Sequence, residues 1–207
     1  MLSSIRMRIL LAIFLFEVAG YGTLTLHNKS DTEEALLTVR QRQLSDVFEA
    51  STSRLNGLTD EEYFWQPVED CWTIHPDGSI DFTYPEPQPP PFTNIAWRLA
   101  HVIVGVLAMR NYSHFGGPPA DYQSWNYATD AATAMRQLDE QYRKWIDGVR
   151  GLSDDDLHRP CGPAEGPYAD YPFIALVLHI NREVIHHGAE IACIRDLYAH
   201  TNHEKGK

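Results

Sequence analysis

The segment HINREVIHHGAEI, residues 179–191, carries three histidines and two glutamates in a stretch of helical character. An α-helix turns about 100° and rises about 1.5 Å per residue. Glu183 and His187 are four positions apart, so they lie on one helix face about one turn from each other. His179 begins that face, Glu190 continues it, and His186 lies at its edge. Imidazole and carboxylate groups on a common face can hold a metal ion or exchange protons.

A further histidine, His101, lies in the apolar segment NIAWRLAHVIVGV. If the two segments face each other in a helical bundle, His101, Glu183 and His187 form a three-ligand set with a position open for water or substrate. The residue pattern alone leaves a metal site and a buried polar network as alternatives. His179 lies about 12 Å along the helix from His187, too far to share the ion, and could line the mouth of the site. His186 points about 100° away from His187, toward a neighbouring helix or solvent.

Four helical segments would position these residues. Apolar residues at helical spacing predict helices from Ser30 to Asn56, from about Thr93 to Gly116, from about Asp130 to Val149, and from about Pro172 to Tyr198. The predicted fold class is therefore all-α, and the predicted architecture is a four-helix bundle. The second and fourth helices would supply the three ligands.

The connections between the helices have patterns of their own. GLTDEE from Gly57 and GLSDDD from Gly151 each follow a predicted helix, either as a weak repeat of two helix-loop-helix halves or as an ordinary helix stop and restart. Between the first and second helices, Asp77-Gly78 and the alternating apolar residues of 72–84 predict a small hairpin. PEPQPPP, residues 85–91, follows and predicts a stiff extended strap.

Composition limits the class of protein. A chain of 207 residues with 43% hydrophobic residues suits one domain with a full core. A formal net charge of −11 argues against a nucleic-acid partner, because phosphate binding needs clustered lysine and arginine. The three cysteines form no CxxC motif and cannot all pair, which favours a reducing compartment. We expect residues 1–29 to be an N-terminal extension, 30–199 the bundle and 200–207 a tail.

The extension begins MLSSIRMRILLAIFLFEVAG, with two arginines before an apolar run. The run is too short to span a bilayer as a helix, so we expect no stable membrane insertion. A signal peptide cleaved near Gly20 is one interpretation. We favour an extension translated from an upstream start codon, because Glu17 directly follows the apolar run and the cysteine count is odd. The predicted location is the cytoplasm, with export left open as the alternative.

Two segments resemble a known family. TNIAWRLAHVIVGVLAMRNYSHFGG and HINREVIHHGAEIACIRDLY are similar to the DinB-like superfamily, in the branch common among actinobacteria, and the resemblance covers about Asp31 to Tyr198. It implies a metal held by one histidine of the second helix and an H-x-x-x-H pair of the fourth. Glu183 stands where the first histidine of that pair would be. The resulting set of His101, Glu183 and His187 resembles the metal site of the mycothiol-dependent maleylpyruvate isomerase and of the mycothiol S-transferases. Many relatives have glutamine in an HHRGQI-like run, where HHGAEI has Glu190.

The resemblance implies a metal-dependent S-transferase or isomerase that uses a low-molecular-weight thiol such as mycothiol. Its partners would be a small-molecule thiol and an electrophile, and a homodimer is compatible with the family. Two imidazoles and a carboxylate suit zinc, with nickel, manganese and iron as alternatives. Glu190 and His179 are the expected supporting residues. A metal-dependent hydrolase that activates water and a metal-binding, stress-associated bundle without turnover are the alternatives, so whether the protein is an enzyme stays open.

Overall fold

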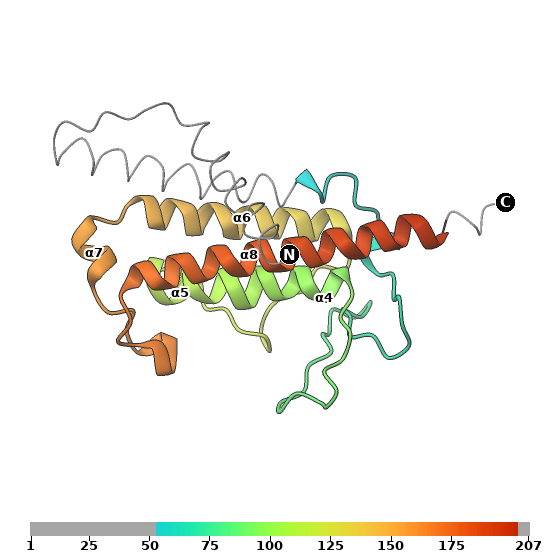
Figure 1. The fold of residues 1–207 in the computed structure, drawn as a ribbon, viewed down its shortest axis with the longest axis horizontal. Helices are drawn as coiled ribbons and strands as arrows, with labels where there is room; N and C mark the ends of the chain where they lie inside the picture. The colour runs from blue at the N-terminus through green and yellow to red at the C-terminus, as the bar shows by residue number, and fades with distance from the viewer. Residues whose placement is uncertain (1–52, 203–207) are drawn as a thin grey trace, which may run out of the picture. The chain divides into compact units, whose positions relative to one another are not determined.

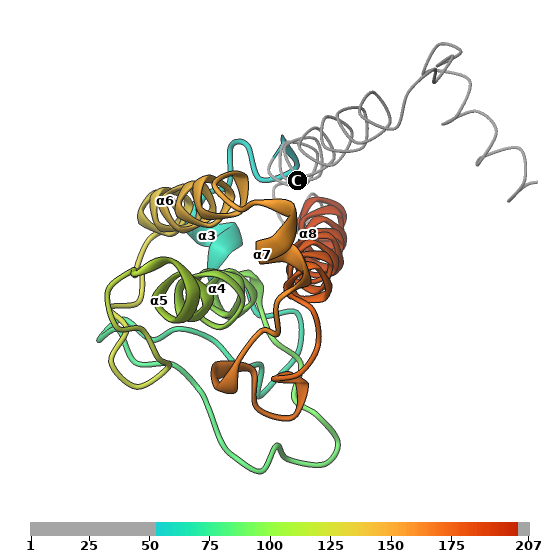
Figure 2. The same cartoon turned by 90° about the vertical axis from the view of Figure 1, so that its left-hand side faces the viewer.

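The computed structural model describes residues 53–202 (Figure 1). Two long helices are α6, Ala131–Arg150, and α8, Phe173–Asn202. A third helical segment is continuous from Ile95 to Phe115 and consists of α4 (Ile95–Ala100), the π-helical stretch η1 (His101–Ala108) and α5 (Met109–Phe115). This segment packs against both α6 and α8, so it is the central element of the described chain (Figure 2).

The ends of these helices follow from local side chains. The Asn94 side chain accepts a hydrogen bond from the backbone N–H of Trp97 and starts α4, and Asp130 starts α6 in the same way by accepting from Thr133. Gly116 ends α5 with a φ of +68°, a left-handed conformation that glycine adopts without steric cost. These ends agree with the predicted helices near Thr93, Gly116 and Asp130. Helix α8 continues to Asn202, beyond its predicted end near Tyr198.

The two GL-S/T-D segments form matching short helices. Helix α3, Asp60–Tyr63, begins after the cap Thr59, and α7, Asp154–His158, begins after the cap Ser153. In each case the cap hydroxyl accepts a hydrogen bond from a backbone N–H three residues later. A 3₁₀ stretch, η2, covers Pro163–Tyr168 between α7 and α8. Each copy of the pattern therefore marks the start of a short capped helix.

Apolar residues of the central segment form the core. Ile95, Leu99, Ile103 and Leu107 are almost fully buried and face Trp145 of α6 and a row on α8. The α8 row consists of Phe173, Val177, Ile180, Val184, Ile191 and Ile194. Burying one such side chain stabilises the fold by about 1.5–3 kcal/mol, so this shared core fixes the central segment against α8.

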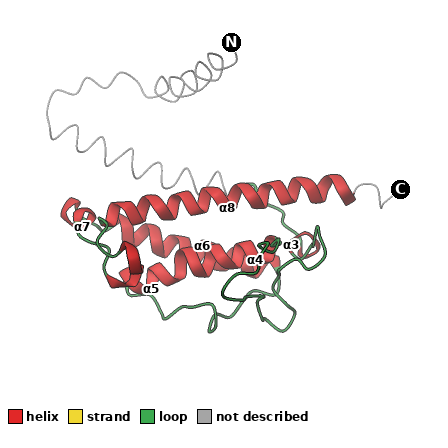
Figure 3. Ribbon diagram, turned by 60° about the horizontal axis from the view of Figure 1, so that its bottom comes forward, coloured by secondary structure: helices red, strands yellow, loops and turns green. Residues whose placement is uncertain are grey.

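The connection before α4 contains the predicted hairpin in a short form. The described chain has no named strand (Figure 3), and the turn at Asp77-Gly78 is closed by a single antiparallel bridge between Ile74 and Ile80. The side-chain carboxylate of Asp81 accepts a hydrogen bond from the backbone N–H of Thr73 at 2.9 Å, where a longer hairpin would have a backbone carbonyl as the acceptor. Pairing cannot continue into residues 85–91, because proline has no N–H to donate. The hairpin is thus confined to residues 73–81, where the N–H groups of His75 and Asp81 donate to the carbonyls of Ser79 and Thr73. The proline-rich residues that follow form an irregular, largely exposed loop.

Several sequence predictions lie outside residues 53–202. These are the extension of residues 1–29 with its signal-like run, most of the first helix and the last part of the tail. The all-α class is confirmed for the described residues, and the complete four-helix bundle stays a prediction because its first helix is not among them. None of the helices in this part of the chain is both long enough and apolar enough to cross a membrane.

Candidate metal centre

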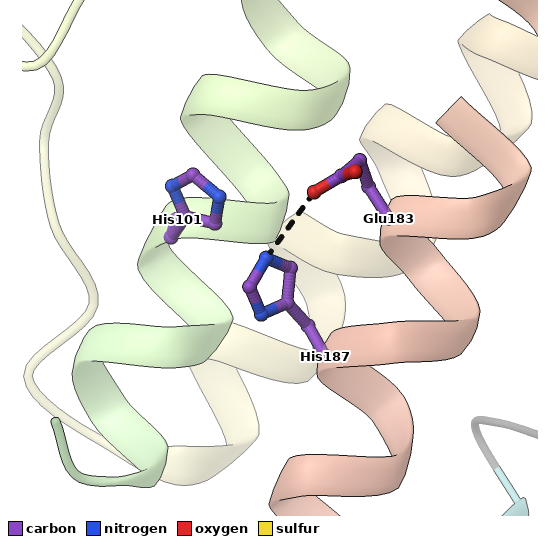
Figure 4. A group of neighbouring side chains, drawn as sticks. All are labelled: His101, Glu183 and His187. Carbon is purple, nitrogen blue, oxygen red and sulfur yellow. Dashed lines mark ion pairs between the residues drawn. The ribbon is translucent and has the colours of Figure 1, made fainter. Parts of the chain in front are cut away.

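His101, Glu183 and His187 come together between the central segment and α8 (Figure 4). One ligand atom from each lies within 4.8 Å of the others. The Nε2 atom of His187 is 3.6 Å from Oε2 of Glu183, and the rings of His101 and His187 meet edge to face with centroids 4.7 Å apart. Two ligands of one tetrahedral zinc ion lie about 3.4 Å apart, as its bond lengths of about 2.0–2.2 Å require. The three side chains therefore fit a divalent ion with only small adjustments.

The Nδ1 atom of His187 is already engaged. It lies 2.8 Å from Oε2 of Glu190, one turn further along α8, and the same carboxylate pairs with Arg98 of α4. A carboxylate that accepts from Nδ1–H fixes the tautomer in which Nε2 has a free lone pair. Partial burial opposes ionisation of Glu190, but the hydrogen bonds from His187 and Arg98 outweigh it and lower the pKa of the carboxyl. Glu190 thus stays charged and orients His187 toward Glu183.

His101 is held in a corresponding way. Its Nδ1 is 2.5 Å from the hydroxyl of Tyr122, and its ring stacks on Trp97 with centroids 5.6 Å apart. Burial and the neighbouring His187 lower the pKa of His101 to about 4, so the imidazole is neutral at pH 7. Burial raises the pKa of Tyr122 to about 12, which keeps its phenol protonated. When Nδ1–H donates to the Tyr122 oxygen, Nε2 of His101 is the nitrogen available to an ion.

Gly105 makes room for this contact. It lies one turn beyond His101 in the π-helical stretch, a type of turn that is frequent at functional sites. A Cβ built on Gly105 would overlap the hydroxyl oxygen of Tyr122 and lie 3.2 Å from Nδ1 of His101. Any larger residue would therefore push Tyr122 away from the imidazole.

The remaining predicted residues lie at the edge of the centre. His179 is 3.5 Å from Oε1 of Glu183 and also accepts a hydrogen bond from Arg182, so it lies beside the ligand carboxylate. The His186 side chain is 61% exposed, and its Nε2 is 3.4 Å from Oε1 of Glu190. His186, His187 and Glu190 form a second group whose ligand atoms also lie within 4.8 Å of one another. The more enclosed group with His101 is the better candidate, because it draws ligands from two elements and leaves Glu190 to orient His187.

Three contributors to the centre were not singled out from the sequence. Arg98 could have been suspected, because an arginine inside the apolar run NIAWRLAHVIVGV lies one turn before His101. Trp97 lies four residues before His101 in the same helical segment, so the spacing of the two residues could have indicated that their rings stack. Tyr122 lies in the irregular connection between α5 and α6, where no periodicity indicates which way a side chain faces.

Comparison with known proteins identifies the family. The sequence model described as the DinB superfamily matches residues 43–191, which is more than half of the chain. No curated protein and no solved structure gives a significant match. The matched range contains the whole central segment, α6 and the part of α8 that carries Glu183, His187 and Glu190. The chain therefore belongs to the DinB superfamily.

Proposed function

We propose that the protein is a metal-dependent S-transferase or isomerase that uses a low-molecular-weight thiol, with His101, Glu183 and His187 as the ligands of one divalent ion. The observation that carries this proposal is the orientation of His187, whose Nδ1 is bonded to Glu190 while Nε2 faces Glu183. Such a carboxylate–histidine pair typically accompanies a metal-ligating imidazole. Membership of the DinB superfamily is consistent with a metal-binding protein.

The ligand set favours zinc. Two neutral imidazoles and one carboxylate with an open position suit a catalytic zinc ion, and nickel, manganese and iron accept the same mixed nitrogen and oxygen ligands. A bound divalent ion would lower the pKa of a thiol and stabilise the thiolate, which is the nucleophilic form. The carboxylate of Glu183 would cancel one unit of the ion's charge. A thiolate at this site would then be held less tightly, and be more nucleophilic, than beside three neutral imidazoles.

The surrounding residues would orient the ligands. Arg98 and Glu190 hold His187 from one side, and Tyr122 holds His101 from the other. The ring of Phe82, from the connection that precedes α4, stacks on Tyr122 with centroids 5.2 Å apart.

Hydrolysis with an activated water is the second candidate function. It needs a positioned general base, and Glu190 is the nearest carboxylate that is not in the proposed ligand set. Glu190 is already paired with Arg98 and His187, and those hydrogen bonds lower its pKa, which weakens it as a base. These contacts favour the thiol reaction over hydrolysis.

The first experiment tests the ligands. Replacing His101, Glu183 or His187 by alanine should each remove most of the zinc that copurifies with or is added to the protein, measured by elemental analysis. His186→Ala and His179→Ala are the controls and should retain it. If His186→Ala loses the metal while His101→Ala retains it, the ion belongs to the group with His186 and Glu190, and the proposed ligand set is wrong.

The second experiment tests the thiol chemistry through Glu183→His. The variant should retain metal, because imidazole is an equivalent zinc ligand. The ion would keep its full charge, so mycothiol or a cysteine-derived analogue should bind at least as tightly, while turnover with an electrophile such as a chlorodinitrobenzene should fall. Glu140→His, on the exposed face of α6, is the matched control and should change neither quantity. If the variant keeps ester hydrolysis and its turnover of thiol with the electrophile does not fall, the hydrolase is favoured instead.

A further inference from the structure

A cavity of about 640 Å³ lies beside the candidate metal centre. It is formed by α5, the η2 loop and the first half of α8, and both Arg110 and Arg182 line it. Its size is typical of a pocket for a small organic ligand. We propose that this cavity binds a small organic acid, with its carboxylate at Arg182 and Arg110 and its planar or apolar body against Tyr168 and Tyr171. The role of this acid as the electrophile rests on the proposed function.

The cavity and the metal centre share a wall. His179 and Arg182 line the cavity, and both contact Oε1 of Glu183, at 3.5 Å and 3.3 Å. Arg110 of α5 also lines the cavity and donates to the backbone carbonyl of Gly105, the residue that packs against Tyr122 and His101. A ligand in the cavity would therefore lie next to the ligand carboxylate of the centre.

The charge of the cavity favours an anion, although the chain as a whole has a net charge of −11. Glu165 is the acidic residue of the lining, and it is already paired with His114 at 2.9 Å and with Arg110 at 3.2 Å. The Nε of Arg110 is buried and does not face the cavity, but the Arg110 side chain is 24% exposed and bonds Gly105 and Glu165 through Nη1 and Nη2, each of which has a second N–H. The Arg182 side chain is 71% exposed, and its hydrogen bonds to Glu183 and His179 both start from Nη2. Because a guanidinium has five N–H donors, the other nitrogens of Arg182 can donate to a ligand. Both arginines thus have donors left for a carboxylate.

The rest of the lining favours a planar or apolar body. Tyr168 and Tyr171 are 64% and 56% exposed, and their rings meet edge to face with centroids 5.7 Å apart. Leu176, Ala175 and Pro167 complete the apolar surface. The loop reaches this position through Gly166, whose φ of +54° and ψ of −120° are accessible to glycine and strained for other residues. Two exposed tyrosines beside a pair of cations are the arrangement expected for a ligand with an apolar body and one acidic end.

The test uses 3-phenylpropanoate and its neutral isostere 3-phenylpropanamide as probes in calorimetry with the full chain. The acid should bind at least tenfold more tightly than the amide, as one charge-assisted pair with arginine provides. Arg182→Gln should remove that preference, while Arg143→Gln, an equally exposed arginine of α6 at 72%, should leave it unchanged. Tyr168→Ala should weaken both probes. Equal affinity for acid and amide, no binding of the acid, or no effect of Arg182→Gln would overturn the proposal.

Removal of metal with a chelator separates this proposal from the proposed function. Because the carboxylate is placed on arginine and not on the ion, affinity for the acid should change by less than about threefold in the metal-free protein. Loss of acid binding with the metal, together with insensitivity to Arg182→Gln, would place the carboxylate on the ion and refute the cavity site. A chain that holds no metal but binds the acid through Arg182 would refute the proposed metal centre and leave the cavity assignment standing.

Discussion

Glu190 gives the sharpest test of how the candidate centre is built. It is proposed to act through His187, since it accepts from Nδ1 at 2.8 Å and leaves Nε2 for the ion. Loss of such an orienting carboxylate typically weakens metal binding about 10- to 100-fold. We therefore expect Glu190→Ala to raise the zinc dissociation constant about 100-fold, or about 2.7 kcal/mol, and Glu190→Gln, which can still accept from Nδ1–H, about 10-fold.

The assay is competition with a chromophoric zinc chelator at pH 7, with circular dichroism to show that each variant folds. Glu190→Ala also leaves Arg98 without its carboxylate, and because Glu190 is about 30% exposed the cost to the metal-free fold should be only about 1 kcal/mol. His186→Ala is the control, because His186 touches the same carboxylate at 3.4 Å without orienting His187 toward Glu183. Its zinc affinity should stay within about twofold of the wild type.

Two results would refute this reasoning. If Glu190→Ala binds zinc as tightly as the wild type, Glu190 does not orient His187. If Glu190→Ala and His186→Ala both abolish zinc binding, Glu190 is itself a ligand in the group formed with His186 and His187. In that second case Nδ1 and not Nε2 of His187 would face the ion.

The remaining predictions concern packing, pH and the N-terminal residues. Gly105→Ala should lower the free energy of unfolding in urea by about 1–3 kcal/mol, because the added methyl overlaps the Tyr122 hydroxyl; an unchanged value would contradict that contact. Glu165→Gln should cost about 2 kcal/mol at pH 7, because the Glu165 carboxylate is 7% exposed and bonded to His114. The hydrogen bond from His114, with Arg110, lowers the pKa of Glu165 below its usual 4.5. The stabilisation by the Glu165 carboxylate is therefore complete above pH 4.5 and is lost as the pH falls through the lower pKa of the folded state. The free energies of unfolding of wild type and variant, measured in urea, should converge below pH 4.5. Deleting residues 1–20 should leave solubility and zinc content unchanged, whereas a chain beginning near Tyr21 in the cell envelope would contradict a cytoplasmic location.

Much of the helical framework could be predicted from the sequence. The helices have apolar residues at 3.6-residue spacing. Capping residues mark where they begin, as at Asn94 and Asp130, and where they end, as at Gly116. Both signals are local in the sequence. The predicted hairpin is present in a short form, with one antiparallel bridge between Ile74 and Ile80 and a backbone hydrogen bond from Asp81 N–H to the Thr73 carbonyl. Alternating residues around Asp77-Gly78 favour strands locally, but the Asp81 side chain and the prolines of 85–91 prevent a ladder from extending.

The sequence also determined which residue types were available for chemistry. The spacing of Glu183 and His187 fixes them on one face of α8 whatever the rest of the chain does, because helix geometry depends only on the backbone. His101 could be paired with them only through the assumption that two helices face each other. Tertiary packing decides that pairing, since the buried residues of the central segment and of α8 set the rotation of each helix about its axis.

Tertiary structure alone decided the surroundings of the candidate ligands. The hydroxyl of Tyr122 reaches His101 because Gly105 leaves space for it, although Tyr122 lies in a connection with no periodic pattern. Arg98 meets Glu190 across 92 positions of sequence. Hydrogen bonds of this kind depend on where side chains end in space, and a one-dimensional pattern does not specify that position. The sequence therefore determined the chemical groups and their helices, and packing decided which nitrogen of each histidine is left for an ion.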